Sequence, residues 1–170
     1  MSKLSLRELA ALSLIGALLV ASKQLMTFLP NIEPVTLLLM CTTMVYGLKA
    51  LYPCYVFVLL QGLLYGMGLW FINYLYIWAL LVLAVYLLRR NTSWIIWTVV
   101  GAMYGLCFGA LCAIPYFFIG GWQMAFAYWI AGIPYDLLHL AGNAVMCGIF
   151  LKPLTGLLRK LAAGKYPPAP

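Results

Sequence analysis

The hydrophobic positions of the chain form long, almost unbroken runs separated by short polar or glycine- and proline-containing breaks. An α-helix that crosses a bilayer needs about 20 consecutive apolar residues. Six runs approach that length, and they cover residues 9–29, 35–48, 51–69, 70–88, 94–118 and 134–158. The pattern therefore predicts an all-α membrane protein with six transmembrane helices.

The breaks between the runs set the expected boundaries. Pro30 to Pro34 predicts a turn after the first run, and Gly120-Gly121 predicts a break after the fifth. Residues 122–133 are apolar, but Gly132 and Pro134 separate them from the last run. We expect one six-helix domain over residues 1–165 and a disordered, proline-rich tail over residues 166–170.

Composition excludes a soluble globular domain. The chain has 170 residues, of which 66% are hydrophobic and 8% are charged. Soluble domains are about half apolar and about a quarter charged. The six predicted spans use almost the whole length, so no room remains for a soluble catalytic domain.

The net charge of +7 comes from ten basic and three acidic residues. The basic residues lie at the ends of the apolar runs and form no single patch, so a nucleic-acid partner is not expected. Cytoplasmic loops of membrane proteins are enriched in Lys and Arg. With both termini in the cytoplasm, only Lys23 faces outward, and nine basic residues face inward: Lys3, Arg7, Lys49, Arg89, Arg90, Lys152, Arg159, Lys160 and Lys165. This split predicts a multi-pass protein of the cell membrane.

The candidate chemistry centres on the start of the last run. Asp136, His139 and Asn143 are spaced by three and seven residues, which places them on one helix face. In one interpretation, Asp136 caps the helix and the other two satisfy buried carbonyls. In the other, this face opens into a cavity on the outer side. One histidine and one aspartate are too few for a zinc site, and the five cysteines include no C-x-x-C pair. We expect no metal and no cofactor.

Further polar and aromatic residues are expected near the outer opening of this cavity. An apolar, aromatic cavity with a few polar anchors is the usual form of a small-molecule site. An aromatic belt at the membrane interface is the alternative for part of this set. The candidate substrate-binding residues are Asp136, His139, Asn143, Asn31, Glu33, Asn73, Trp70, Tyr74, Trp122 and Tyr135, with Lys23 and Gln24 close by.

Small residues recur at four-residue spacing in three runs. Such stripes let membrane helices approach closely. Those at Gly101, Gly105 and Gly109 and at Gly62 and Gly66 are expected to pack within the chain. The stripe of Ser13, Ala17 and Ala21 is either a further internal contact or a docking face for another membrane protein.

Two stretches resemble the substrate-binding S components of energy-coupling factor (ECF) vitamin transporters. Ala17-x-x-x-Ala21 is similar to the A-x-x-x-A motif with which this family contacts its transmembrane coupling protein. Residues 132–139, Gly-Ile-Pro-Tyr-Asp-Leu-Leu-His, are similar to the P-F-N-L-I-K stretch of riboflavin-type members. Asp136 and His139 stand where that stretch has the vitamin-contacting asparagine and lysine, which argues against riboflavin.

The resemblance implies a transport component of the bacterial plasma membrane that is not itself an enzyme. It would capture a vitamin from outside and deliver it with a coupling protein and two cytoplasmic ATPase subunits, toppling in the membrane. Residues 31–34 and 122–133 look most like cobalamin-type members, which slightly favours that vitamin. The chain has no P-loop motif, consistent with this division of labour.

Two other classes of function are kept open. A small integral-membrane enzyme could use Asp136 and His139 as acid and base, although the sequence offers no nucleophile motif or metal cluster beside them. A membrane assembly factor is the second alternative, and such a protein has no need of a polar-lined pocket.

Overall fold

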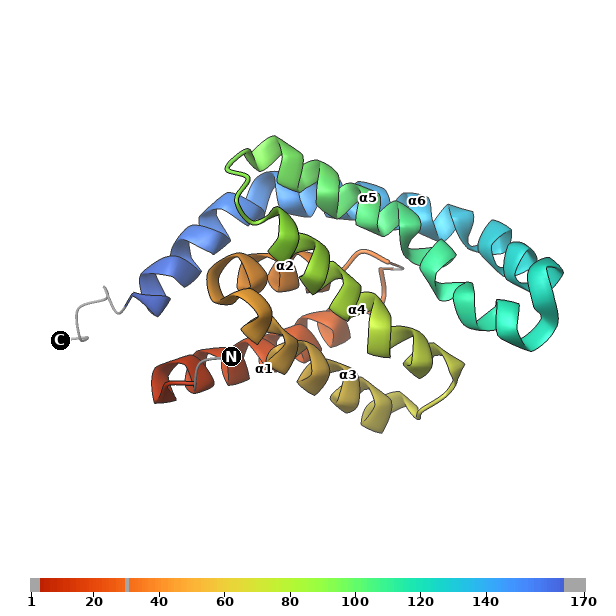
Figure 1. Ribbon diagram of the computed structural model, residues 1–170, viewed down its shortest axis with the longest axis horizontal. Helices are drawn as coiled ribbons and strands as arrows, with labels where there is room; N and C mark the ends of the chain where they lie inside the picture. The colour runs from red at the N-terminus through yellow and green to blue at the C-terminus, as the bar shows by residue number, and fades with distance from the viewer. Residues whose placement is uncertain (1–3, 30, 164–170) are drawn as a thin grey trace.

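The computed structural model describes residues 4–29 and 31–163, and the regular secondary structure in these residues is entirely helical. This confirms the all-α expectation. The predicted tail at 166–170, the domain limit at 165, and Lys3 and Lys165 lie outside the described residues. The elements are α1 (Leu6–Leu25), α2 (Val35–Tyr46), a short 3-10 helix η1 (Gly47–Ala50), α3 (Leu51–Tyr65), α4 (Leu69–Leu88), α5 (Trp94–Cys112) and α6 (Ile114–Ala162) (Figure 1).

Five helical segments among the described residues are long and apolar enough to cross a membrane. They are α1, the continuous segment Val35–Tyr65, α4, α5 and α6. The sixth expected span is missing from this count because α2 has only 12 residues, about 18 Å of helix at the usual rise. Length and composition alone therefore place α2 and α3 in one segment.

The chain nevertheless reverses direction between α2 and α3 (Figure 1). Gly47 begins the reversal with a φ of 60°, which a residue with a side chain rarely adopts. At the start of α1, Glu8 pairs with Lys49, which precedes α3, at 2.6 Å. At the end of α1, Gln24 accepts a hydrogen bond from Tyr65, the last residue of α3. Helices α1 and α3 therefore run side by side in one direction, and α2 runs in the opposite direction.

Local capping explains where α1 begins. Ser5 accepts a hydrogen bond from the Glu8 backbone N–H at 3.2 Å, and the Ser5 N–H donates to the Glu8 carboxylate at 2.9 Å. This reciprocal capping box satisfies two backbone donors that the first turn leaves free. The helix consequently starts at Leu6, three residues before the expected apolar run.

The last helix departs most from the expected boundaries. The chain breaks at Gly120-Gly121, as predicted, because both residues are non-helical and Gly121 has a φ of 72°. The expected separation at Gly132 and Pro134 is wrong, since α6 remains helical through both residues. Apolar membrane helices tolerate proline because neighbouring groups satisfy the freed carbonyl. The fifth run is also shorter than expected, because α5 ends at Cys112.

Helix α2 is the most enclosed element. It packs against α6, α4 and α1, and most of its residues are buried, including the polar Thr36, Thr42 and Thr43. The hydroxyl groups of Thr42 and Thr43 donate hydrogen bonds to backbone carbonyls one turn earlier in the helix, at 2.6 Å to Leu38 and at 2.7 Å to Leu39. The core around α2 includes the largest fully buried side chains: Trp78, Phe57, Leu19, Leu39, Met40, Ile77 and Leu81.

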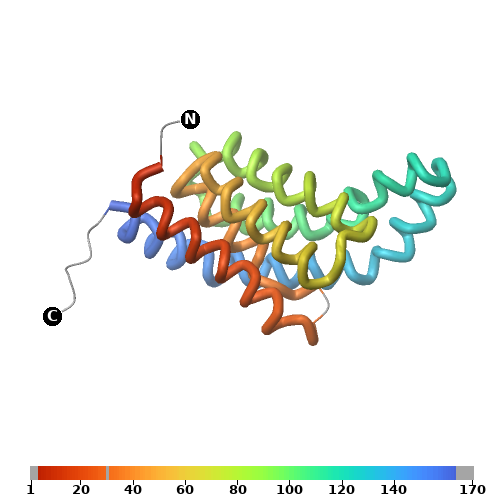
Figure 2. Tube along the Cα trace, turned by 90° about the horizontal axis from the view of Figure 1, so that it is seen from below, coloured from red at the N-terminus to blue at the C-terminus, as the bar shows by residue number. Residues whose placement is uncertain are grey.

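The basic residues gather at one end of the bundle, here called the basic end, which carries Arg7, Lys49, Arg89 and Arg159. Lys49 pairs with Glu8 in the first turn of α1, and a Cβ atom added at Gly47 would lie 3.6 Å from the Arg89 guanidinium group. Arg7, near the start of α1, and Leu161, near the end of α6, line one groove. The opposite end, here called the Lys23 end, carries Lys23 at the end of α1. In Figure 2 the first turns of α1 lie beside the C-terminal half of α6, and the end of α5 and the start of α6 extend past the other helices.

Candidate functional site

A cavity of about 380 Å³ lies at the Lys23 end between α5, α6 and the connection from α1 to α2. We call it the Asp136 pocket. Asp136 lines it together with three aromatic side chains, Phe108, Tyr128 and Tyr135. The lining residues are Asn31, Phe108, Gly109, Cys112, Tyr128, Ala131, Gly132, Tyr135 and Asp136.

Asp136 is 2% exposed, although it lines this pocket. Its Oδ1 atom accepts a hydrogen bond from the Gly109 backbone N–H at 2.8 Å, and its Oδ2 atom has no partner among the described residues. Because α6 is already helical before Asp136, the interpretation of Asp136 as a helix cap is wrong. A buried polar atom without a partner costs folding free energy, so it calls for an explanation such as a ligand.

Glycine at position 109 makes this arrangement possible. A Cβ atom at Gly109 would overlap the Asp136 carboxylate, with Oδ1 only 2.8 Å away. A Cβ atom at Gly105 would lie 2.7 Å from the backbone carbon of His139, and one at Gly101 would lie 2.7 Å from the Cys147 sulfur. The glycine stripe of α5 therefore packs along α6, as predicted, and brings its backbone to the polar face of that helix.

His139 and Asn143 share the helix face of Asp136, as their spacing predicted, but neither lines the Asp136 pocket. The His139 ring is 2% exposed and packs against Phe108, with ring centroids 4.9 Å apart. Both of its nitrogens lack a partner among the described residues. The Asn143 amide donates to the Gly101 carbonyl at 3.1 Å and the Thr36 hydroxyl at 3.4 Å, so it serves internal packing.

The connection from α1 to α2 closes one side of the pocket. Asn31 has a φ of 55°, a left-handed conformation that asparagine tolerates better than most residues. Its amide donates to the Tyr135 backbone carbonyl at 3.2 Å. Next to it, Ile32 contacts the helix at Gly142, where an added Cβ would meet its side chain at 3.4 Å. Asn31 and Tyr135 are thus predicted site residues that the fold brings to Asp136.

A second cavity, the Lys23 pocket, has a volume of about 350 Å³ and lies between α1, α3 and α4. It is lined by Lys23, Thr27, Gln61, Tyr65, Trp70 and Tyr74. Lys23 is paired with Glu33 at 2.5 Å, and its ammonium group lies 6.0 Å from the centre of the Tyr74 ring. The predicted residues Glu33, Trp70 and Tyr74 therefore gather here rather than at Asp136.

A row of aromatic rings connects the two pockets. It runs from Trp70 through Tyr74, Trp78 and Phe108 to His139, with successive centroids 5.2, 5.5, 5.5 and 4.9 Å apart. These spacings lie in the range of favourable aromatic contacts. The row forms the rigid interior wall behind both pockets.

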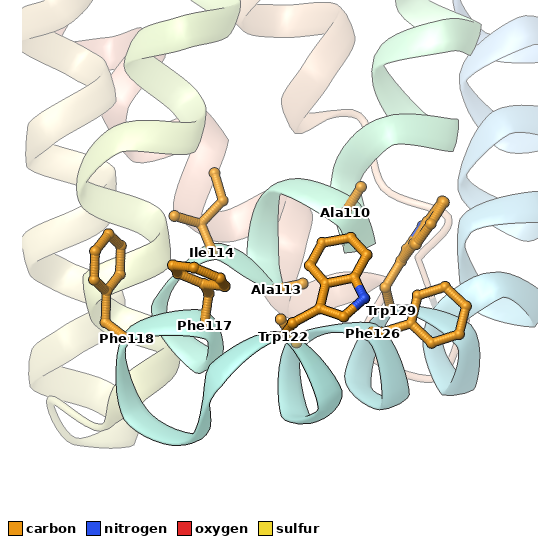
Figure 3. Close-up of a pocket in the computed structure, with 9 residues that line it drawn as sticks. Ala110, Ala113, Ile114, Phe117, Phe118, Trp122, Phe126 and Trp129 are labelled. Atoms are coloured by element: carbon orange, nitrogen blue, oxygen red, sulfur yellow. The ribbon is translucent and has the colours of Figure 1, made fainter.

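Besides His139 and Asn143, two further predicted residues line neither pocket. Trp122 is exposed and lines a third, apolar cavity of about 400 Å³ between the end of α5 and the start of α6, where Figure 3 shows it with Phe117 and Phe126 on either side. Asn73 is 3% exposed, and its side-chain oxygen accepts a hydrogen bond from the Tyr76 hydroxyl at 3.2 Å.

Sequence reasoning did not single out Gln61 and Phe108. Gln61 is 1% exposed, and its amide nitrogen has no partner among the described residues. A lone amide inside an apolar run was a detectable signal, because polar groups in membrane spans are rare and face the protein interior. Phe108 carried no such signal, since its role depends on where α5 meets α6.

The outer face of α1 carries the predicted docking stripe. Ser13, Ala17 and Ala21 are exposed, whereas Leu12, Ile15, Gly16 and Leu19 on the opposite face are buried. Gly16 provides the close contact with α3, since a Cβ added there would lie 3.7 Å from Pro53 Cα. The internal-packing alternative gains no support from the exposed positions of Ser13, Ala17 and Ala21.

No hydrogen bond links Asp136 to His139 among the described residues, and residues 4–29 and 31–163 contain no cluster of three metal-ligating side chains. No family model, curated protein or solved structure matches the chain. The interpretation of the site therefore depends on its own geometry.

Proposed function

We propose that the chain is the substrate-binding S component of an ECF-type vitamin transporter, and that its ligand binds at the Lys23 end. The observation that carries the proposal is the Asp136 pocket: a cavity lined by three aromatic side chains and by a buried carboxyl group with one oxygen that has no partner among the described residues. Small-molecule sites combine apolar walls with a few polar groups in this way. The exposed stripe of small residues on α1 is the second supporting feature.

The proposal includes six transmembrane spans with both termini in the cytoplasm. The reversal between α2 and α3 supports counting these helices as two short spans. The basic end faces the cytoplasm in this orientation, because cytoplasmic segments are enriched in Lys and Arg. Both pockets then face outward, where a vitamin would be captured.

The pocket volumes bear on the identity of the vitamin. The Asp136 and Lys23 pockets measure about 380 and 350 Å³, at the lower end of the range for small-molecule sites. The resemblance slightly favours cobalamin, and compact vitamins match these volumes, so both belong in the test.

The proposed partners are a transmembrane coupling protein, two cytoplasmic ATPase subunits and membrane lipid. The chain lacks a P-loop motif of its own, so energy has to come from ATPase partners. Without a hydrophobic driving force in lipid, small residues allow the close helix contact that such a complex needs. Ser13, Ala17 and Ala21 provide that surface.

The first experiment tests docking. Replacing Ala17 and Ala21 together with leucine should abolish transport and copurification of the coupling protein, because the added bulk keeps the partner helix away. Ligand binding by the isolated protein should remain, since both residues are exposed on the face away from the core. Ala141→Leu, at an exposed position of α6, is the matched control and should leave transport intact. Equal loss of binding and transport in the double variant would contradict the docking role.

The second experiment identifies the ligand. Protein purified from its own membranes is denatured, and released small molecules are identified by mass spectrometry, with cobalamin and compact vitamins as standards. We expect a vitamin to be released by the wild type and to be depleted in Asp136→Ala. A protein that retains no vitamin and copurifies with no ATPase subunits would refute the proposal.

The enzyme alternative draws support from one observation, the two unpartnered nitrogens of buried His139. An acid-base pair must reach the same substrate within hydrogen-bond distance, and His139 lies behind Phe108 rather than in the Asp136 pocket. Chemical conversion of the retained molecule would favour the enzyme. An assembly factor would copurify with partner proteins and release no small molecule.

A further inference from the structure

We infer that the ligand of the Asp136 pocket carries a positively charged nitrogen, such as a protonated amine, beside a flat ring. This inference rests on the proposed function in one respect, because it takes the Asp136 pocket as the site of capture. It adds the charge of the ligand, which the resemblance does not give.

The first step is the distribution of charge around the pocket. The residues that line it include one acidic side chain, Asp136, and no basic one. The basic groups nearest in the fold are engaged elsewhere or not bonded to Asp136: Lys23 lines the other pocket and is paired with Glu33 at 2.5 Å, and His139, on the same helix face, makes no hydrogen bond to Asp136 among the described residues. A buried carboxylate is strongly disfavoured unless it is paired and hydrogen-bonded. The structure supplies one backbone N–H to Oδ1, and Oδ2 has no partner among the described residues, so a cationic ligand would compensate the charge.

The second step is the chemistry of the walls. Phe108, Tyr128 and Tyr135 line the pocket together with Asp136, and Tyr128 stacks on Tyr116 at a centroid distance of 4.0 Å. Aromatic faces attract cations, and the attraction grows when water is excluded. A carboxylate together with several aromatic rings is therefore complementary to an organic cation.

The third step distinguishes an organic cation from a metal ion. Calcium takes about six to eight oxygen ligands, and magnesium requires an octahedral set. The described residues hold no cluster of three acidic, cysteine or histidine side chains that could bind a metal. An ammonium group needs only one strong acceptor and an aromatic surface, and the pocket has both.

The experiment compares probes that differ in charge but not in shape. Two pairs serve: pyridoxamine with pyridoxine, and tryptamine with its alcohol analogue tryptophol. Binding to the full chain in detergent micelles is measured by titration calorimetry at probe concentrations into the millimolar range. The wild type should bind each amine more tightly than its alcohol, by about tenfold to a hundredfold, as expected for a hydrogen bond to a charged group.

Two sets of variants locate the preference. Asp136→Asn keeps the shape of the side chain and removes its charge, so the preference for the amine should disappear. Tyr128→Leu keeps the carboxylate and removes one aromatic wall, so amine affinity should fall while some preference remains. Glu33→Gln and Gln61→Leu alter the other pocket and should leave the preference unchanged. Thermal unfolding of each variant checks that the protein is folded.

Several results would overturn the inference. These are alcohols that bind as tightly as amines, a preference for the amine that survives in Asp136→Asn, and amines that do not bind at all. The outcome is separable from that of the proposed function. A retained neutral vitamin would support the proposed transport function and overturn the inference of a charged ligand. Amine binding by a protein that retains no vitamin and copurifies with no ATPase subunits would support the charged ligand and refute the transport function.

Discussion

At the scale of single residues, the α6 polar face contains three side chains in three different situations. Asp136 opens to a cavity, His139 is enclosed by aromatic rings, and Asn143 is hydrogen-bonded to α5 and α2. The spacing in the sequence predicted that they share a face, because helical periodicity is local. Their separate environments depend on Gly109, Phe108 and Thr36, which are 27 to 107 residues away, and no local pattern contains that information.

The buried imidazole gives a prediction at this scale. His139→Phe should raise the free energy of unfolding by about 1 kcal/mol, because it removes two buried nitrogens that lack partners. The ring would keep its contact with Phe108. Chemical denaturation of the detergent-solubilised protein measures the change.

Asn143→Leu is the control for the imidazole prediction. It removes an amide that has two partners, so it should lower stability by about 1–3 kcal/mol. A His139→Phe protein that is less stable than the wild type would show that the imidazole has partners in the folded protein that the structure does not reveal.

At the scale of elements, the sequence was most informative where one helix could be judged alone. The apolar runs located most helices, and the Gly120-Gly121 break was confirmed. The capping box extended α1 by three residues beyond its apolar run. The expected boundary at Gly132 and Pro134 was wrong because helix-breaking residues act weakly inside apolar membrane helices. The glycine stripe of α5 predicted close packing between helices. The sequence could not predict which face of α1 is exposed, because that depends on the contact of Gly16 with α3.

The glycine stripe gives a prediction for the α5–α6 contact. Gly105→Ala should lower the free energy of unfolding by about 1–3 kcal/mol, as overpacking does. The added Cβ would lie 2.7 Å from the backbone of His139, which cannot move aside as a flexible side chain can. The change is measured by unfolding in detergent.

The matched control is Gly156→Ala in α6. An added Cβ at Gly156 meets no atom within 4 Å, so this variant should be as stable as the wild type or slightly more so, because alanine favours helix. Similar losses at both positions would mean that the two helices are packed less closely than the structure shows.

At the scale of the whole molecule, the basic residues and the Asp136 and Lys23 pockets lie at opposite ends. The basic end holds Arg7, Lys49, Arg89 and Arg159, and the Lys23 end holds the two polar-lined pockets. The sequence could predict the first half of this arrangement, because basic residues at the ends of apolar runs are visible without a structure. It could not predict that the candidate residues divide between two pockets, since that depends on how the α1–α2 connection lies between them.

Labelling of single cysteines tests the orientation. In a variant lacking the five native cysteines, a cysteine at Gly121 should react with a membrane-impermeant maleimide added to intact cells, and a cysteine at Asn91 should not. Gly121 lies in the break within α6, at the end opposite to the Asn91 turn that follows Arg89 and Arg90. The physical reason is the preference of Lys and Arg for the cytoplasmic side, which places the basic end inside. Asn91 should become reactive once the cells are permeabilised, which controls for a buried thiol. Labelling at Asn91 but not at Gly121 in intact cells would invert the molecule, place both pockets in the cytoplasm and remove the basis for capture from outside.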